Sequence, residues 1–318
     1  MASTYVSIVN VYYRVTRLNL ALNELKPHPE CILCLIHVRG REIVSSGLSL
    51  DDKRRCLECI LEEMSRLLSN DIDVPVIATK LFRLVRRLTG IDDPYAVEKK
   101  LANSIASRFR PIVENWIRSI DDSYQRFRRA CISAVVGNTI DVGASEHKFS
   151  LDNLLDSIIK AELTIDDTIS IFDMVHRYKG RIVYVCDNAG EIVFDGILIQ
   201  ILEDMGLRVS VLVKSEPYQN DAMLIDAWEA GIPEVASEVL PLIPGTSGLI
   251  VDELPVEAIE KLRNADLIFM KGMANLETLE NVRAYGKPVV CLLQAKCTPI
   301  ARILNVPLKS NVVKLFKA

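Results

Sequence analysis

The sequence lacks a strong excess of charge of either sign. Its 318 residues include 38 Lys and Arg against 42 Asp and Glu, which gives a formal net charge of -4. A nearly balanced surface has no general attraction for nucleic acid or for an anionic membrane, so we expect neither as a partner. The composition, 49% apolar and 25% charged, is typical of a folded globular protein and argues against a disordered chain.

Long hydrophobic runs are also absent. The chain has no stretch of about 18 or more uninterrupted apolar residues, so the sequence predicts no transmembrane helix. The start, MASTYVSIVNVYYRVTRLNLALNELKPHPEC, lacks the basic beginning and compact apolar core of a secretion signal. We therefore expect a cytoplasmic protein.

Cysteine is too sparse for a disulfide-dense secreted domain, with eight in the chain. Two pairs nevertheless have CxxC spacing, Cys31/Cys34 and Cys56/Cys59. Such pairs can bind zinc, form disulfides or remain free thiols. The gap between the pairs is slightly longer than in a usual zinc ribbon. The helical spacing of apolar residues in CLECILEEMSRLL favours free thiols in a core, but all three states stay open.

The first half of the sequence has the periodicity of amphipathic helices. Apolar residues recur about every 3.6 positions through most of residues 51–136. The segment 79–90 ends in glycine, and the segment 92–120 opens with Asp and Pro, which are common helix stop and start signals. These features predict an all-helical N-terminal domain over residues 26–150.

From about residue 151 the pattern changes to alternating helices and strands. Two helical segments, 151–162 and 165–180, come first. Strands are then expected at 181–187, 208–214, 266–271, 288–294 and 311–316, and helices at 191–206, 221–231, 255–265 and 277–286. Continuous apolar strands alternating with helices predict a mostly parallel, Rossmann-like sheet with helices on both faces. Residues 151–318 are therefore expected to form a three-layer α/β/α domain.

Polar side chains collect where these predicted strands end. Asp187 and Asn188 follow the first strand, Asp221 lies beyond the second, Lys271 ends the third, and Lys296 follows the fourth. Ligands of open parallel sheets bind beyond the carboxyl ends of the strands. Carboxylate and amide oxygens suit Mg²⁺ or Mn²⁺, and lysines suit phosphate oxygens. Each acid or amide alone is also a good helix cap; four strand ends together favour a metal and phosphate site.

Several motifs resemble those of the damage-control phosphatases, formerly called domain of unknown function 89. They are CDNAGEIVFD, NDAM, KGMANLETL and LLQAKCTPIAR, while KPHPECILCLI and GNTIDVG are similar to the shorter archaeal and bacterial branch. The resemblance runs from about Lys26 to the C-terminus, so that residues 1–25 lie outside it, either as an N-terminal extension or as the result of an early assigned start. It implies a metal-dependent phosphoric monoester hydrolase acting on small phosphorylated metabolites, such as sugar phosphates or damaged phosphometabolites. It also implies a helical N-terminal region followed by an α/β metal-binding domain.

The resemblance also implies roles for individual residues. Asp187, Asn188 and Asp221 correspond to the ligands of a divalent ion, which we expect to be Mg²⁺, Mn²⁺, Co²⁺ or Ni²⁺. The attacking group is then either a water activated by the ion or Asp187 itself, although Ala189 stands where a phosphoaspartate enzyme has a second Asp.

Other positions correspond to substrate contacts. The family's glutamate after the Asp-Asn pair and its Lys-Gly-x-x-Asn stretch are present in this chain. We predict catalytic roles for Asp187, Glu191 and Lys271. We predict substrate contacts for Glu191, Lys271, Gly272, Asn275 and Lys296. Departures from the family pattern at Met223, Met273 and Ala274 lie in the expected pocket and bear on the choice of substrate.

Two other classes of protein stay open. A Rossmann-type nucleotide-binding enzyme fits the sheet pattern, but such a site has G-x-G-x-x-G after the first strand, and here that turn is Asp-Asn-Ala-Gly-Glu. A non-catalytic metabolite-binding or interaction protein, stapled by zinc or another metal at the CxxC pairs, is the second alternative. A methyltransferase is less favoured, because no glycine-rich adenosyl-binding turn is present.

Overall fold

The computed structural model describes residues 27–70, 72–137, 156–177 and 180–317. The expected N-terminal extension and most of the GNTIDVG motif lie outside these residues. Within them, no helix is long and apolar enough to cross a membrane.

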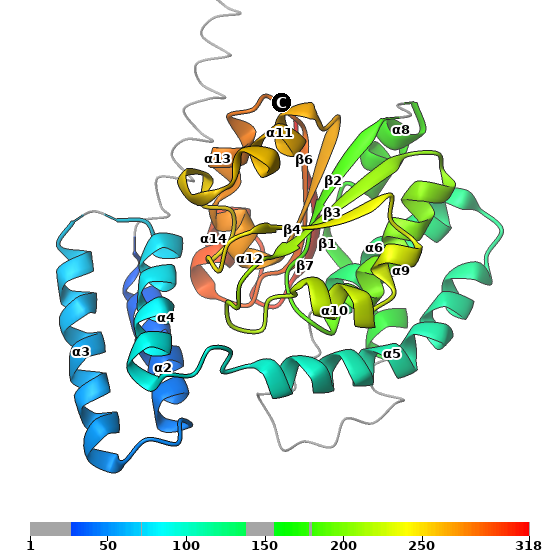
Figure 1. The fold of residues 1–318 in the computed structure, drawn as a ribbon. Helices are drawn as coiled ribbons and strands as arrows, with labels where there is room; N and C mark the ends of the chain where they lie inside the picture. Colours follow the sequence, from blue (N-terminus) through cyan, green and yellow to red (C-terminus); the bar gives the residue numbers. More distant parts are fainter. Residues whose placement is uncertain (1–26, 71, 138–155, 178–179, 318) are drawn as a thin grey trace, which may run out of the picture.

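Three helices at the start of the described chain form a unit beside the rest of the molecule (Figure 1). They are α2 (Pro29–Val44), α3 (Leu50–Leu68) and α4 (Val74–Thr89). Their apolar stripes meet in a core that includes Ile43, Ile60 and Leu81. Local signals set their ends: the Ser49 side chain accepts a hydrogen bond from the backbone at the start of α3. Gly90, with a φ of 70°, ends α4.

The next two helices pack on the α/β part of the molecule. They are α5 (Ala96–Arg118) and α6 (Ser123–Val136). Both share one hydrophobic core with α8 (Thr168–Arg177), α9 (Glu191–Asp204) and one face of the sheet. In Figure 1, α5 runs along the lower edge of the α/β part. The predicted domain boundary at residue 150 stays a prediction. Helices α5 and α6, which precede it, share their hydrophobic core with the α/β part.

A seven-stranded sheet forms the centre of the molecule. Its strands are β1 (Leu163–Asp166), β2 (Arg181–Val185), β3 (Arg208–Lys214), β4 (Glu238–Ile243), β5 (Leu267–Lys271), β6 (Val289–Gln294) and β7 (Asn311–Phe316). The order across the sheet is β1-β7-β6-β5-β2-β3-β4. Every neighbouring pair is parallel except β6 and β7. The predicted mostly parallel sheet is therefore confirmed.

Two strands, β1 and β4, are absent from the sequence prediction. Both lie at the edges of the sheet. The first has only four residues, alternately half-buried and exposed, which is too short for a clear period-two signal. The second contains Pro241, and a proline inside a run argues against an interior strand but is tolerated at an edge.

Helices cover both faces of the sheet, which confirms the three-layer architecture. One face carries α6, α8, α9 and α10 (Leu224–Glu229), and α5 packs against α9. The other carries α11 (Val256–Asn264), α12 (Gly272–Glu277), α13 (Leu279–Arg283) and α14 (Thr298–Leu304). Short 3₁₀ turns, η3 (Ile232–Glu234) and η4 (Val251–Glu253), lie in the connections. Along β2, Ile182 and Tyr184 face the first side, and Val183 and Val185 the second.

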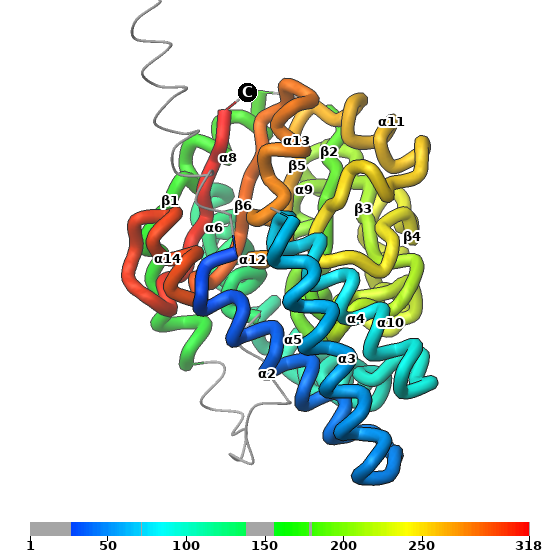
Figure 2. The backbone as a smooth tube through the Cα atoms, turned by 90° about the vertical axis from the view of Figure 1, so that its left-hand side faces the viewer, coloured from blue at the N-terminus to red at the C-terminus, as the bar shows by residue number. Residues whose placement is uncertain are grey.

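The strand order reverses at β2. The chain proceeds from β2 to β3 and β4 in one direction, whereas β5 and β6 lie on its other side, an arrangement that Figure 2 shows from the side. Such a switch point opens a crevice beyond the carboxyl ends of the strands, where ligands of open α/β sheets bind. The residues that follow β2 are therefore the first place to look for a functional site.

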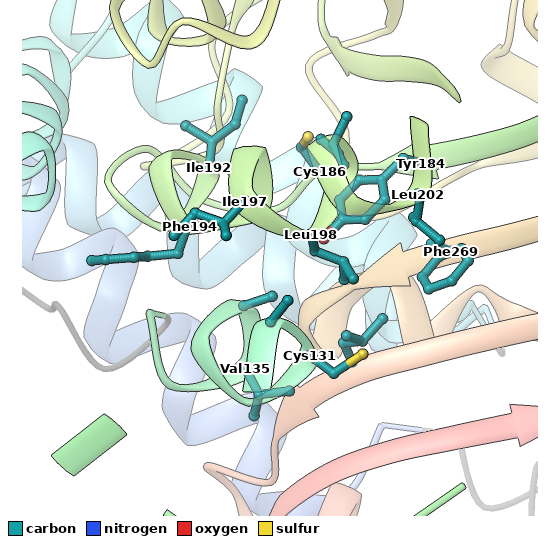
Figure 3. Close-up of a cluster of buried hydrophobic side chains, with 14 of the residues drawn as sticks. Cys131, Val135, Tyr184, Cys186, Ile192, Phe194, Ile197, Leu198, Leu202 and Phe269 are labelled. Carbon is teal, nitrogen blue, oxygen red and sulfur yellow. The ribbon is translucent and has the colours of Figure 1, made fainter. Parts of the chain in front are cut away.

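Buried side chains between α6, α9 and the sheet form a core that holds α9 in place (Figure 3). Leu198 and Leu202 of α9 pack there with Cys131 of α6. The rings of Tyr184 and Phe269, from neighbouring strands, stack with centroids 5.7 Å apart. Because α9 begins at Glu191, the packing of this helix also fixes the position of Glu191, a predicted site residue.

We expect the Leu198→Ala variant to lower the free energy of unfolding by about 2–5 kcal/mol, because the side chain is fully buried and its loss leaves a cavity. Urea denaturation followed by circular dichroism measures this change. Leu61, which is 51% exposed on α3, provides the control, since its replacement by Ala is expected to change stability little. Equal effects of the two substitutions would contradict the assigned packing.

Candidate active site

The loop that follows β2 lies against the loop that follows β3. The backbone N–H of Ala222 donates to the carbonyl of Asp187 at 2.7 Å, and that of Ala189 donates to the carbonyl of Asn220 at 2.9 Å. Asn188 and Asp221 form an isolated antiparallel bridge. Asp187 and Asn188, which are adjacent in the sequence, are therefore neighbours of the third predicted ligand, Asp221, which comes from a different loop. Their role in holding an ion stays a prediction.

The two carboxylates of this group are buried close to other negative charge. Asp187 and Asp221 are 9% and 6% exposed. Burial, together with the charges of Glu191 and Asp221, raises the pKa of Asp187 well above its ordinary value. Burial also raises the pKa of Asp221 to about 6, although the Lys214 ammonium, 3.4 Å from its carboxylate, acts in the opposite direction. A cation bound between the carboxylates would relieve this repulsion.

The donor set fits a hard divalent ion. Within the described ranges, no group of three or more His, Cys, Asp and Glu side chains is arranged to hold a metal. The candidate site instead has two carboxylates, Asp187 and Asp221, and one amide, Asn188. Such oxygen donors are typical of Mg²⁺ or Mn²⁺ sites, which keep several positions for water and substrate.

Gly272 makes room for the Asp187 carboxylate. It follows β5 directly and has a φ of 78°, in the left-handed region that favours glycine. A Cβ at this position would lie only 2.0 Å from Oδ2 of Asp187. The backbone after β5 therefore packs directly on the carboxylate and fixes its position, and any other residue would displace it.

Lys271 is fully buried, and its ammonium group has protein partners. It donates to the carbonyl of Ala134 at 2.8 Å, contacts the Glu191 carboxylate, and lies 2.8 Å from Oδ1 of Asp195. Burial opposes its charge, but the two carboxylates raise the pKa of Lys271 above its ordinary value. These three partners match the three ammonium protons. The predicted contact between Lys271 and phosphate would require one of them to be exchanged, so that contact remains a prediction.

The amide groups connect the site residues to one another. The Asn188 amide nitrogen donates to Oδ2 of Asp187 at 2.8 Å and to Oε2 of Glu191 at 3.3 Å. The Asn275 amide nitrogen donates to the carbonyl of Lys271 at 2.7 Å and to that of Cys186 at 3.3 Å. Its Oδ1 is buried and has no hydrogen-bond partner among the described residues. Asn275 therefore ties β5 to the end of β2 and keeps one acceptor available.

Lys296 lies at the rim of the same site. Its side chain is exposed, and its charge lowers the pKa of Asp187 against the larger effect of burial. Its backbone N–H lies 3.3 Å from Sδ of Met273. The structure therefore brings all the predicted site residues to one end of the sheet, with Lys296 the more accessible of the two predicted cations.

Three further residues shape the site and were missed by the sequence prediction of site residues. Asp195 pairs with Lys271, and Lys214, which donates to the carbonyl of Thr246 at 2.5 Å, pairs with Asp221. The Asn103 side chain of α5 accepts a hydrogen bond from the Gly190 N–H at 2.6 Å. Asp195 had a signal, since it is an acid one turn after Glu191 in an apolar helix.

The CxxC pairs lie on two neighbouring helices. Cys31 and Cys34 are on α2, and Cys56 and Cys59 are on α3. All four are free. Cys56 is buried in the core of α2, α3 and α4, as the helical spacing indicated, whereas Cys31 and Cys59 are half-buried and Cys34 is exposed. Among the described residues these cysteines form no group of three or more ligands that could hold a metal, so the zinc-stapled alternative has no geometric support.

Comparisons with known proteins agree on one family. The model of the Damage-control phosphatase ARMT1-like domain matches residues 28–312. A damage-control phosphatase of Archaeoglobus fulgidus is 34% identical over 299 residues, which cover 92% of this chain and 100% of the relative. A damage-control phosphatase of Pyrococcus horikoshii is 30% identical over 285 residues, 89% of this chain and 96% of the relative. The crystal structure of a DUF89 family protein from P. horikoshii superposes with a TM-score of 0.81 at 27% identity and covers 91% of this chain and 98% of its own.

We expect the Gly272→Ala variant to bind divalent ions at least about tenfold more weakly, because the new methyl group displaces the Asp187 carboxylate. Calorimetric titration with Mn²⁺ measures this affinity. Gly286→Ala is the matched control: its φ is 66°, and a Cβ there meets nothing within 4 Å. Both variants bear the strain of a left-handed alanine, about 1–2 kcal/mol. An unchanged Mn²⁺ affinity in Gly272→Ala would refute the assignment of Asp187 as a ligand of the ion.

Proposed function

We propose that this chain, which belongs to the damage-control phosphatase ARMT1-like family, is a metal-dependent phosphatase of small phosphorylated metabolites. The observation that carries the proposal is the meeting of Asp187, Asn188 and Asp221 at the switch point of the sheet. The names of the two relatives, damage-control phosphatases of A. fulgidus and P. horikoshii, support it. The substrates are then sugar phosphates or damaged phosphometabolites.

Asp187, Asn188 and Asp221 would hold the divalent ion, which is Mg²⁺, Mn²⁺, Co²⁺ or Ni²⁺. When bound, the ion supplies a Lewis acid for the phosphoryl oxygens and lowers the pKa of a bound water. The chain's contribution is to fix the donors: Gly272 leaves space for Asp187, and Lys214 lies beside Asp221. The charge of the ion would also keep both carboxylates ionised at neutral pH.

Glu191 is the residue we assign to orienting the substrate or the attacking water. It is 1% exposed and begins α9. The Lys271 ammonium contacts one of its oxygens, and the Asn188 amide donates to the other. A carboxylate held on both sides keeps its orientation as the phosphate binds. In this proposal Lys271 acts by positioning Glu191, and Lys296 at the rim supplies charge for the phosphate oxygens.

We favour water over Asp187 as the attacking group. Asp187 is buried against Gly272 and hydrogen-bonded by Asn188, which supports a role in holding the ion and disfavours an attack of its carboxylate on phosphorus. Ala189 also stands where a phosphoaspartate enzyme has its second Asp. The dinucleotide-binding alternative has less support, since a Cβ on Gly190 would lie 2.9 Å from Cβ of Ala102. Helix α5 thus covers the turn that a pyrophosphate would occupy in a Rossmann site.

We expect the Asp187→Ala variant to lose more than about 100-fold of the metal-stimulated hydrolysis of 4-nitrophenyl phosphate, because it removes a ligand of the ion. Initial rates with Mn²⁺ or Co²⁺ measure the loss, and circular dichroism checks that the fold persists. Asp204→Ala is the control, because Asp204 is exposed at the far end of α9. Full activity of Asp187→Ala with either ion would show that the ligand assignment is wrong.

A further inference from the structure

A cavity of about 460 Å³ extends to Asn220, the residue that precedes the candidate ligand Asp221. It is formed by α2, the segment that joins α4 to α5, and the loop after β3. Gln219 and Asn220, which line it, directly precede Asp221, and Asn220 is held beside the β2 loop by the N–H of Ala189 at 2.9 Å. The volume is within the usual range of small-molecule sites. The cavity is therefore placed to receive the organic part of a phosphate ester whose phosphate lies at the ion.

Glu42 presents an incompletely bonded carboxylate in the wall of this cavity. It is 8% exposed. Its Oε1 accepts a hydrogen bond from the hydroxyl of Tyr95 at 2.7 Å. Its Oε2 lies 3.3 Å from an Arg39 nitrogen as an ion pair but has no hydrogen-bond donor within the described part of the chain. A buried oxygen of this kind retains the capacity to accept a hydrogen bond from a ligand.

Arg39 stands behind Glu42 and is fully buried. Its guanidinium group lies 5.0 Å from the centre of the Phe82 ring, and none of its three nitrogens has a hydrogen-bond partner in the described residues. A buried ion pair that lacks hydrogen bonds is costly to fold. Burial raises the pKa of Glu42, while Arg39 and Tyr95 oppose that change. Oε2 of Glu42 is thus a fixed acceptor without a hydrogen-bond donor among the described residues, while Oε1 is held by Tyr95.

We propose that Glu42, backed by Arg39 and held by Tyr95, accepts a hydrogen bond from a hydroxyl group on the organic part of the substrate. The proposal rests on the phosphatase function proposed above. The other polar groups of the cavity, including those of Ser46 and Gln219, suit a hydroxyl-bearing ester better than an apolar one. In this proposal, residues of α2 help to select the substrate, whereas residues at the ends of the strands bind the ion and the phosphate.

Paired substrates test the proposal. Ribose 5-phosphate has hydroxyl groups to donate, and 4-nitrophenyl phosphate has none. The variant should remove both buried charges, as in Arg39→Met with Glu42→Gln, because Glu42→Gln alone leaves Arg39 uncompensated and endangers folding. We expect the ratio of kcat/KM for ribose 5-phosphate to that for 4-nitrophenyl phosphate to fall about tenfold, mainly through KM for ribose 5-phosphate.

A milder variant and a matched control accompany the double variant. Tyr95→Phe removes only one hydroxyl group, and it should lower the same ratio to a smaller extent. Glu63→Gln changes another Arg–Glu pair at i,i+3 spacing, with Arg66 on α3, and should leave the ratio unchanged. An unchanged ratio in the double variant, or equal losses on both substrates, would overturn the assignment of Glu42.

A binding measurement separates failure of this proposal from failure of the phosphatase function. In calorimetric titrations with Mg²⁺ present, the double variant should bind ribose 5-phosphate about tenfold more weakly than the unaltered chain. Its affinity for inorganic phosphate should change much less. If the double variant binds ribose 5-phosphate selectively more weakly but the unaltered chain hydrolyses no phosphate ester, the role of Glu42 in binding would stand and the phosphatase function would be rejected. Equal weakening for both ligands would reject the binding site.

Discussion

The pairing of the loop after β2 with the loop after β3 is the constraint on which the rest of the site depends. Two backbone hydrogen bonds, Ala222 to Asp187 and Ala189 to Asn220, hold together carboxylates that repel each other. Burial strengthens the repulsion, as the raised pKa values of Asp187 and Asp221 indicate. The paired loops thus keep two repelling carboxylates close together, which is unfavourable without a bound cation. The same arrangement suits a divalent cation.

The sequence alone predicted the part of the site that follows from the topology of the strands. Asp187 and Asp221 come after apolar strands, and parallel strands bring their carboxyl ends to one edge. The surroundings of Lys271 could not be predicted in the same way. Its partners Glu191 and Ala134 are 80 and 137 positions away in the sequence, and no local pattern records such contacts. The sequence therefore predicted a phosphate contact for Lys271, which stays a prediction, but it did not predict the buried ion pairs that the structure shows.

The same limit applies to the fold. Long apolar strands such as β3 and β6 were visible, whereas the edge strands β1 and β4 were hidden by their short length and by Pro241. Periodicity located α5 and α6, but an amphipathic stripe does not say which surface it covers. Only the structure shows that α6 packs on the sheet, that α5 packs on α9, and that Asn103 of α5 reaches the turn after β2.

The contact between Gly190 and Ala102 has a consequence for how this architecture can be altered. A Cβ on Gly190 would meet both the side chain and the backbone of Ala102, so the β2 turn and α5 fit each other without spare room. The helical half and the α/β half of the chain therefore cannot be exchanged independently between homologues. A chimera that joined the helical half of one homologue to the sheet of another would need both sides of this contact from the same parent.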